Sequence, residues 1–321
     1  MKTRTKAWLI IASFFIVLGT AMFVGVMSRY DWDFTKLSTV KYEQSIYELN
    51  GDFKNISINT NVADIVFEVS ENEECSVSCY EAKNLNHAVS IIDGTLKIEV
   101  VDMREWYDHI GINFTSPKIT VYLPKIEYEA LKIDESTGNI EIPKDITFKN
   151  IDISTSTGNV RNYASALDDI KIKTDTGNIC IEDIYAEKLD LSASTGEIML
   201  SNINCEGDIK ISVSTGKTNI TNVNCRNIIS KGSTGDIMFK SLKAADKISV
   251  ERSTGDVRID NCDAGEIFIK TDTGDVTATV RSEKIFVTET DTGKVEVPKT
   301  TQGGKCEIIT STGDIKVGIV D

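Results

Sequence analysis

Apolar residues follow two different patterns along this chain of 321 residues. Between Ala7 and Ser28 there are 22 consecutive residues without an ionisable side chain, whereas apolar and polar residues alternate in short runs from about residue 41 onward. The uncharged run predicts a helix long enough to cross a bilayer, because about 20 helical residues span the hydrocarbon core. Alternation with a period of two predicts β-strands. The chain is therefore expected to be all-β after one apolar helix.

Charges and aromatic residues flank the apolar run as in a single-pass membrane anchor. Three basic residues precede it: Lys2, Arg4 and Lys6. Aromatic residues stand at its two ends: Trp8, Tyr30, Trp32 and Phe34. A cleaved signal peptide is the alternative, but its apolar region is usually about 7–15 residues and ends at a small-residue cleavage site, which is absent here. We therefore expect a cytoplasmic tail (1–6), a transmembrane anchor (7–28), a juxtamembrane linker (29–40) and an extracellular remainder.

A Thr-Gly dipeptide recurs at intervals of 19 or 20 residues through the second half of the chain. Its glycines are Gly138, Gly158, Gly177, Gly196, Gly216, Gly235, Gly255, Gly274, Gly293 and Gly313. The residue seven positions before each glycine is apolar, and so is the residue two positions after it, except at Thr218. Such a short unit cannot bury its apolar face alone, so successive units must stack. Residues 136–321 are thus predicted to form a single-stranded parallel β-solenoid of about ten coils.

The polar residues of each repeat are expected to complete its turn. Glycine supplies a backbone conformation that other residues rarely adopt, and the neighbouring Thr, Ser, Asp or Asn can bond to free backbone groups. Five repeats contain Thr-x-Thr, as at Thr155 and Thr157, and the strand alternation predicts that these threonines point inward at the turn.

Residues 41–135 lack the repeat spacing but alternate in shorter runs, and Asp93-Gly94 reads as a hairpin turn. We interpret this segment as a β-rich N-terminal cap, because the open end of a solenoid exposes unpaired strand edges. The last repeat ends at residues 317–321 without a comparable cap. A homotypic contact at this C-terminal coil is a hypothesis that follows.

These features together resemble a known family. The anchor, the Asp93-Gly94-Thr95-Leu96 and Tyr122-Leu123-Pro124-Lys125 stretches and the repeated Ser-Thr-Gly-Asn/Asp-Ile/Val units are similar to bacterial cell-surface β-strand-repeat proteins of unknown function, labelled candidate adhesins. The resemblance covers roughly residues 40–321. It implies a β-solenoid ectodomain in a bacterial cell envelope, sometimes linked to envelope stress, and supplies no catalytic residue.

The net charge of the chain limits the kinds of partner that it can bind. Three of the 35 basic residues and none of the 49 acidic residues precede residue 29, so the remainder carries a net charge of −17. This balance argues against a nucleic-acid partner and suits metal cations or cationic peptides, although a solvated acidic surface is the commoner explanation. The two histidines, His87 and His109, lie in no recognisable catalytic signature.

We therefore expect a non-enzymatic, membrane-anchored scaffold or adhesin-like protein that meets an envelope protein or glycan and needs no cofactor. One alternative is an envelope-stress accessory that binds a membrane sensor or cationic peptides. A carbohydrate-active enzyme would instead need a cleft with convergent carboxylates between the cap and the first coils.

Two residue sets could carry further chemistry. Calcium could bind where aspartates stack near the repeat turns, at Asp236, Asp256, Asp272, Asp275 and Asp291, although Lys217 and Lys294 bracket them and suggest a mixed charge ladder. Among seven cysteines, Cys205 and Cys225 each lie nine residues after a repeat glycine and should stack, either as a disulfide or as free thiols. Cys75-x-x-x-Cys79 with His87 falls short of four zinc ligands.

Overall fold

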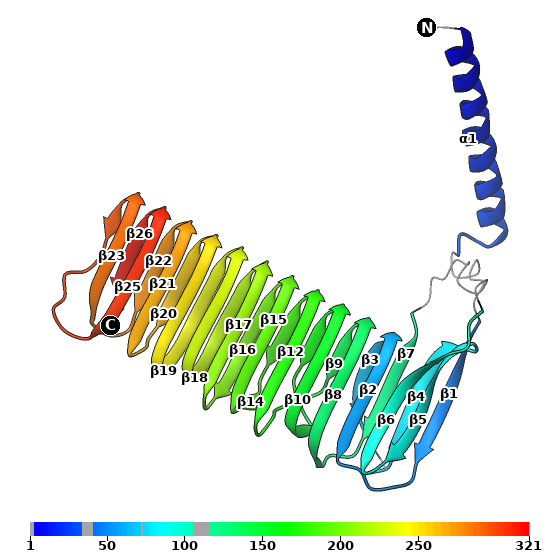
Figure 1. Cartoon of the computed structure of the whole chain (residues 1–321), viewed down its shortest axis with the longest axis horizontal. Coiled ribbons are helices and arrows are strands. Elements are labelled where there is room, and N and C mark those ends of the chain that lie inside the picture. Colours follow the sequence, from blue (N-terminus) through cyan, green and yellow to red (C-terminus); the bar gives the residue numbers. More distant parts are fainter. Residues whose placement is uncertain (1–2, 34–40, 72, 106–115, 321) are drawn as a thin grey trace.

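A computed structural model describes residues 3–33, 41–71, 73–105 and 116–320. One helix, α1 (Thr3–Arg29), precedes an elongated stack of strands (Figure 1). Within it, Trp8–Arg29 has a mean hydropathy of 2.5 and is exposed apart from the buried Met27. This helix is long and apolar enough to be a membrane anchor or a signal sequence. Of the predicted linker (29–40), residues 34–40, which include Phe34, lie outside the described residues.

The strands form the predicted parallel β-solenoid. In each coil, the strand before the repeat glycine joins one sheet and the strand after it joins a second sheet, as in β12 (Asp169–Thr176) and β13 (Ile179–Glu182). Neighbouring coils pair in parallel with equivalent residues opposite each other, for example Ile170 with Leu189 and Ile179 with Ile198. The repeat spacing therefore sets the register directly.

The remaining coil strands follow the same scheme. Those of the first sheet are β8 (Glu127–Thr137), β10 (Thr147–Thr157), β15 (Lys188–Thr195), β17 (Asp208–Thr215), β21 (Glu266–Thr273), β23 (Lys284–Thr292) and β25 (Gly304–Thr312). Those of the second sheet are β9 (Ile140–Ile142), β11 (Val160–Asn162), β14 (Tyr185–Ala186), β16 (Ile198–Cys205), β20 (Val257–Cys262), β22 (Val276–Val280), β24 (Val295–Glu296) and β26 (Ile315–Ile319). Two long strands, β18 (Thr218–Thr234) and β19 (Ile237–Thr254), continue from the second sheet into the first sheet of the next coil.

The core lies between the two sheets and contains the apolar positions that the repeat predicted. Ile170, Ile172 and Ile179 of one coil are fully buried. In the Thr-x-Thr repeats the first threonine mostly points inward as predicted: Thr174 is buried, and its hydroxyl donates to the Gly158 carbonyl of the preceding coil (3.3 Å). The inward prediction is wrong for the second threonine, such as Thr176, which is exposed because the strand pairing skips a residue at the turn.

Repeat glycines allow the coils to approach closely. Gly177 has a φ of 150°, and a Cβ there would collide with the carbonyl oxygen of Gly158 in the preceding coil. Glycine is thus required twice, by its backbone angle and by the contact between coils.

Sequence analysis missed a second turn, which lies six residues after each of the five repeat glycines from Gly177 to Gly255. Asp183, Asn202, Asn222, Ser241 and Asn261 occupy it with φ values of 53–56°. Asn and Asp tolerate this left-handed conformation better than other non-glycine residues. Their side chains also bond along the stack, as from Asn222 Nδ2 to Asn202 Oδ1 (2.8 Å). Small polar residues at a fixed offset from glycine were the available signal.

The N-terminal segment extends the stack before closing it. Strands β2 (Asn55–Val62) and β3 (Asp64–Val69) pair in parallel with β8 and β9, and on their other side with β6 (Thr95–Asp102) and β7 (Lys118–Leu123). Antiparallel strands then complete this end: β5 (Leu85–Ile92), β4 (Cys75–Ala82) and β1 (Tyr42–Leu49). Asp93-Gly94 forms the predicted hairpin turn between β5 and β6.

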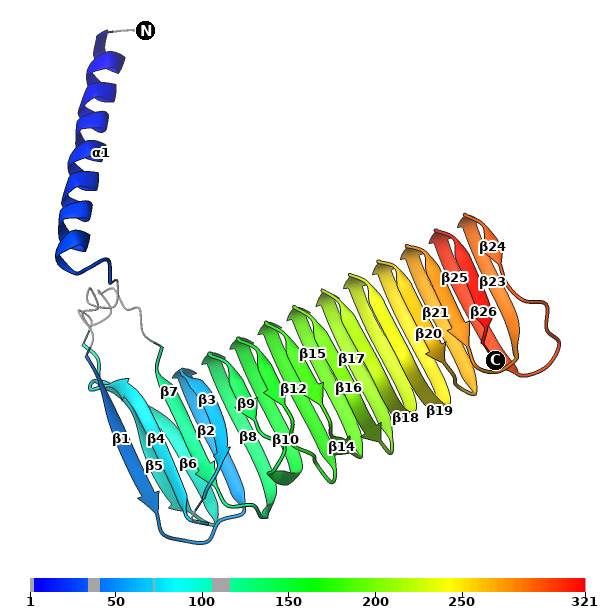
Figure 2. The same ribbon diagram turned by 180° about the vertical axis from the view of Figure 1, so that it is seen from behind.

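At the other end the coil order differs from the chain order. Strand β25 pairs with β21 on one side and β23 on the other, and β26 lies in the same way between β22 and β24. The C-terminal coil is therefore inserted next to the end, as both views show (Figures 1 and 2). The coil at this open end consists of β23 and β24, and the C-terminal coil lies one position inside it. A homotypic contact at this end of the solenoid would therefore involve β23 and β24.

Candidate functional site

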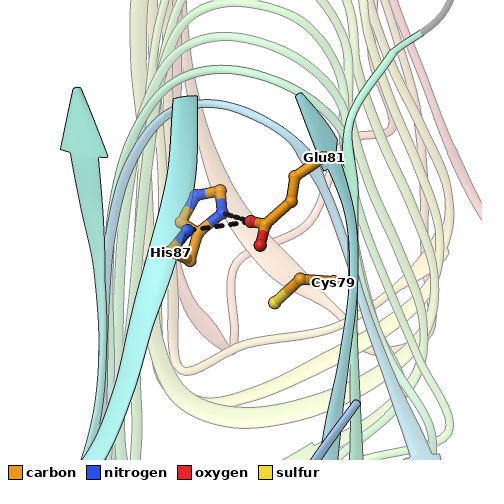
Figure 3. Close-up of side chains that lie close together, drawn as sticks. All are labelled: Cys79, Glu81 and His87. Carbon is orange, nitrogen blue, oxygen red and sulfur yellow. Dashed lines mark hydrogen bonds and ion pairs between the residues drawn. The ribbon is translucent and has the colours of Figure 1, made fainter. Parts of the chain in front are cut away.

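The capped end buries a cluster of three chemically active side chains. Cys79 and Glu81 lie two residues apart on β4 and therefore share one face of that strand. The β4–β5 hairpin returns the chain so that His87 faces them across the interior (Figure 3). Their ligand-type atoms lie within 4.8 Å of one another, and this is the one group of its kind among the described residues. Cys79, Glu81 and His87 are called the Cys79 cluster below.

Hydrogen bonds fix the positions of Glu81 and His87. Glu81 Oε2 accepts the backbone N–H of His87 (2.8 Å) and lies 2.7 Å from the His87 Nδ1 atom. The other ring nitrogen, Nε2, lies 2.8 Å from the Thr60 hydroxyl on β2. The Tyr47 hydroxyl on β1 donates to the backbone carbonyl of His87 (3.1 Å). Strands of both sheets thus hold this imidazole in one orientation.

The Cys79 cluster is almost sealed from solvent. Relative exposures are 0% for Cys79, 4% for Glu81 and 4% for His87. Burial, and then the Glu81 carboxylate, raise the pKa of the Cys79 thiol to about 12. Burial also raises the pKa of Tyr47, with further contributions from Glu81 and Cys79. A nucleophilic thiolate is therefore disfavoured here unless a cation compensates its charge.

A buried carboxyl group lies beside the cluster. Glu135 on β8 is opposite Thr60 in the strand register and is 7% exposed. Its oxygens have no hydrogen-bond partner among the described residues, because the nearby Ala63 N–H donates to the Thr137 carbonyl. Burial, with a contribution from Asp64, raises the pKa of Glu135 to about 8. This carboxyl group is consequently neutral at pH 7.

The cluster only partly matches the sequence expectations. Cys79 and His87 come together as the sequence suggested. Cys75 lies at the other end of β4, and the third member of the cluster is Glu81. Sequence reasoning missed Glu81, although its two-residue spacing from Cys79 was a usable signal. His109 lies outside the described residues.

The predicted stacking beside the repeat glycines forms a polar ladder. Each Asp or Asn side chain accepts the backbone N–H of the equivalent residue in the next coil, as from Asp275 to Asp256 Oδ1 (2.9 Å). The coil exchange makes Asp314 the neighbour of Asp275, so four aspartates stand in succession instead of three. Lys217 contacts one end of this row and the Lys294 amide the other.

These contacts occupy carboxylate oxygens that a calcium ion would need, but they do not test whether calcium binds. The carboxylates of Asp236, Asp256 and Asp275 already accept backbone amides. Asp272 and Asp291 lie on coils separated by the inserted β25, about 9–10 Å apart at the backbone. In the described parts of the chain, no three of the five carboxylates converge within 4.8 Å. Calcium binding at this edge stays a prediction.

A groove of about 780 Å³ opens at the opposite edge of the capped end. Stacked rings of Phe53 and Tyr128 (5.9 Å between centroids) line its apolar part. Turns on either side contribute acidic and basic side chains: Asp52, Glu71, Glu73, Glu74, Lys54 and Lys125. The groove lies within the segment interpreted as the cap, and its acidic side chains all come from residues 52–74.

All seven cysteines are free thiols. Cys205 and Cys225 directly follow the paired Asn204 and Asn224, so they lie on neighbouring coils as predicted. Both are buried, and burial raises the pKa of Cys205 to about 11 and of Cys225 to about 12. Of the two states left open by the sequence, the structure contains the free thiols.

Comparison with known proteins gives one family and several structures. The Toastrack DUF4097 family model matches residues 53–214 and again residues 204–321. A candidate adhesin from Bacteroides fragilis is 14% identical, with 86% of this chain and 97% of that chain covered at a TM-score of 0.43. A candidate lipid-binding protein from Parabacteroides distasonis is 16% identical, with 87% and 98% covered at a TM-score of 0.47. A search of the curated proteins gave no match.

Proposed function

This chain belongs to the Toastrack DUF4097 family, and we propose that it is a non-enzymatic, membrane-anchored β-solenoid scaffold of the bacterial cell envelope. In this proposal α1 spans the membrane with its N-terminus in the cytoplasm. The solenoid stands outside and presents its regular faces to an envelope protein or glycan. The function of the solenoid in this proposal is adhesin-like binding to such a partner.

One observation carries this proposal: an apolar helix whose side chains are mostly exposed precedes an uninterrupted stack of coils. Large apolar side chains of this helix, such as Trp8, Phe14 and Met22, are 62–71% exposed, and a bilayer is the natural place for them. The coils share one continuous core, which makes the ectodomain a rigid support. Their edges repeat the same polar groups at each rung, which suits extended contacts with a repeating partner.

Photo-crosslinking in intact cells tests the proposal. A photoreactive residue at the exposed Lys171 position on β12 should capture an envelope protein or glycan. The same residue at the buried Ile172 position is the matched control and should capture none. Deletion of residues 1–30 should abolish capture, because the solenoid is then no longer held at the membrane. Equal labelling at both positions, or capture that survives the deletion, would contradict the proposal.

The acidic groove supports a second candidate, the capture of cationic amphipathic peptides. Its aromatic part can accept an apolar side chain, and Asp52, Glu71 and Glu73 can meet basic ones. Binding should weaken strongly with salt and fall when all three are changed to Asn or Gln. Asp190→Asn, at an exposed position on β15, is the control that should leave binding unchanged. Salt-independent binding would exclude this role.

We further propose self-association at the open rung. Among the described strands β23 pairs only with β25, and the apolar side chains Ile285, Val287 and Val295 are 43–46% exposed there. Pairing with a second copy would cover both the free strand edge and these side chains. Val287→Lys should reduce association in sedimentation equilibrium, whereas Ser212→Lys in the middle of the stack should not. A wild-type chain that is monomeric at all concentrations would refute this contact.

A further inference from the structure

We propose that Cys79, Glu81 and His87 bind a single divalent transition-metal ion, with zinc as the best match. This site is separate from the polar ladders and the acidic groove, and it does not depend on the scaffold function. The ligand set is one sulfur, one nitrogen and one oxygen donor, which zinc accepts together. Calcium, which takes oxygen donors, is a poor match.

The distances fit a metal ion after a small adjustment. In a tetrahedral zinc site, ligand atoms at ordinary bond lengths are about 3.4–3.6 Å apart. The three ligand atoms already lie within 4.8 Å of one another, and Glu81 Oε2 lies 2.7 Å from His87 Nδ1. That last separation must open by about 0.7 Å for an ion to enter. Side-chain rotation can supply such a shift while the strands stay in place. A water molecule would be the fourth ligand.

Charge balance also favours an ion. A divalent cation with the Cys79 thiolate and the Glu81 carboxylate has no net charge, and His87 adds a neutral donor. A neutral assembly avoids the large cost of leaving unpaired charge in a buried place. Binding would release the proton of the Cys79 thiol to solvent.

Hydrogen bonds from neighbouring groups would orient the metal ligands of the Cys79 cluster. With Nδ1 on the ion, the Nε2–H of His87 can donate to the Thr60 hydroxyl 2.8 Å away. The carboxylate of Glu81 keeps the backbone N–H of His87 as its own partner. Metal-bound imidazoles and carboxylates are commonly oriented in this way.

A purely structural hydrogen-bond network is the competing explanation, and Cys79 distinguishes the two. Glu81, His87 and Thr60 satisfy one another without the thiol. Among the residues that the structure describes, the thiols of Cys205 and Cys262 donate to backbone carbonyls, whereas the other five thiols have no hydrogen-bond partner. Of these five, Cys79 is the one whose sulfur lies within 4.8 Å of both a carboxylate oxygen and an imidazole nitrogen. A metal ion gives Cys79 a role that the network alone does not.

Cobalt titration of the full chain in detergent, after treatment with a chelator, tests this proposal. Wild-type protein should bind one equivalent of Co²⁺ with visible bands of tetrahedral cobalt and a thiolate-to-cobalt charge-transfer band, and Zn²⁺ should displace them. Cys79→Ser should remove the charge-transfer band. Thr60→Val should keep the spectrum and weaken the affinity about 10- to 100-fold.

Cys75→Ser is the matched control, since Cys75 is buried on the same strand but outside the cluster. X-ray absorption of the zinc-loaded wild-type protein needs no folded variant and should find one sulfur neighbour. No charge-transfer band in wild-type protein would overturn the proposal. So would a band that survives Cys79→Ser, or two sulfur neighbours, which would indicate Cys205 and Cys225 instead.

Discussion

Replacing Glu135 with Gln should remove a pH dependence of stability from the capped end of the solenoid. Burial raises the pKa of this carboxyl group from 4.5 to about 8 in the folded protein. Between these two values the unfolded chain releases the proton while the folded protein keeps it. Stability therefore decreases as the pH rises through this window, and the full loss is reached above about pH 8.

The size of this change in the free energy of unfolding follows from the shift in the pKa of Glu135. Each unit of pKa difference corresponds to about 1.4 kcal/mol, so the shift from 4.5 to about 8 destabilises the folded state by about 5 kcal/mol at high pH. At pH 7 the effect is about 3 kcal/mol. Glutamine is neutral at every pH. The variant should accordingly match the wild type near pH 4 and exceed its stability increasingly as the pH rises.

Denaturant unfolding of both proteins at pH 5, 7 and 9 measures this difference. Infrared spectroscopy at pH 7 should also detect the protonated carboxyl group in the wild type and lose that signal in Glu135→Gln. Glu127→Gln, an exposed position on the same strand β8, is the control and should change neither quantity. The reasoning is refuted if wild type and Glu135→Gln respond equally to pH.

Three further predictions follow from the packing. Gly177→Ala should destabilise the solenoid by about 2–5 kcal/mol in thermal unfolding, because the new Cβ meets the glycine carbonyl of the preceding coil. Alkylation without reductant should leave the six buried thiols unmodified in native protein, with the half-buried Cys180 as the accessible one, and should modify all seven after denaturation, whereas a disulfide between Cys205 and Cys225 would leave five. Arg252→Met should be neutral or stabilising by about 1–4 kcal/mol, because the buried guanidinium over Gly232 has no carboxylate partner among the described residues. A large loss of stability would show that its hydrogen bonds dominate.

Much of the fold could be predicted because repeat spacing and strand alternation are local features. The glycine interval gives the coil length, and the apolar positions give the core. The order of the last two coils was not predictable in this way, since β25 satisfies the same pattern beside β21 as beside β23. The connection at residues 297–303, with Pro298 and Gly303, was the available hint that the chain takes another path there.

The capped end was harder to predict for two physical reasons. Ala63 stands where later coils have glycine, so the coil of β2 and β3 lacks the signal that marks the others. The Cys79 cluster depends on the β4–β5 hairpin, which brings His87 across the interior to Glu81. Strand alternation could place Cys79 and Glu81 on one face, but it could not supply the partner strand.

Membrane topology in intact cells tests the central claim most directly, with single cysteines introduced at two exposed positions and labelled by a membrane-impermeant reagent. Lys171→Cys on the solenoid should be labelled equally in intact and lysed cells, whereas Lys6→Cys before the apolar run should be labelled only after lysis. A solenoid cysteine that is protected until lysis would contradict an anchored external scaffold, and so would a chain that alkaline carbonate releases from the membrane.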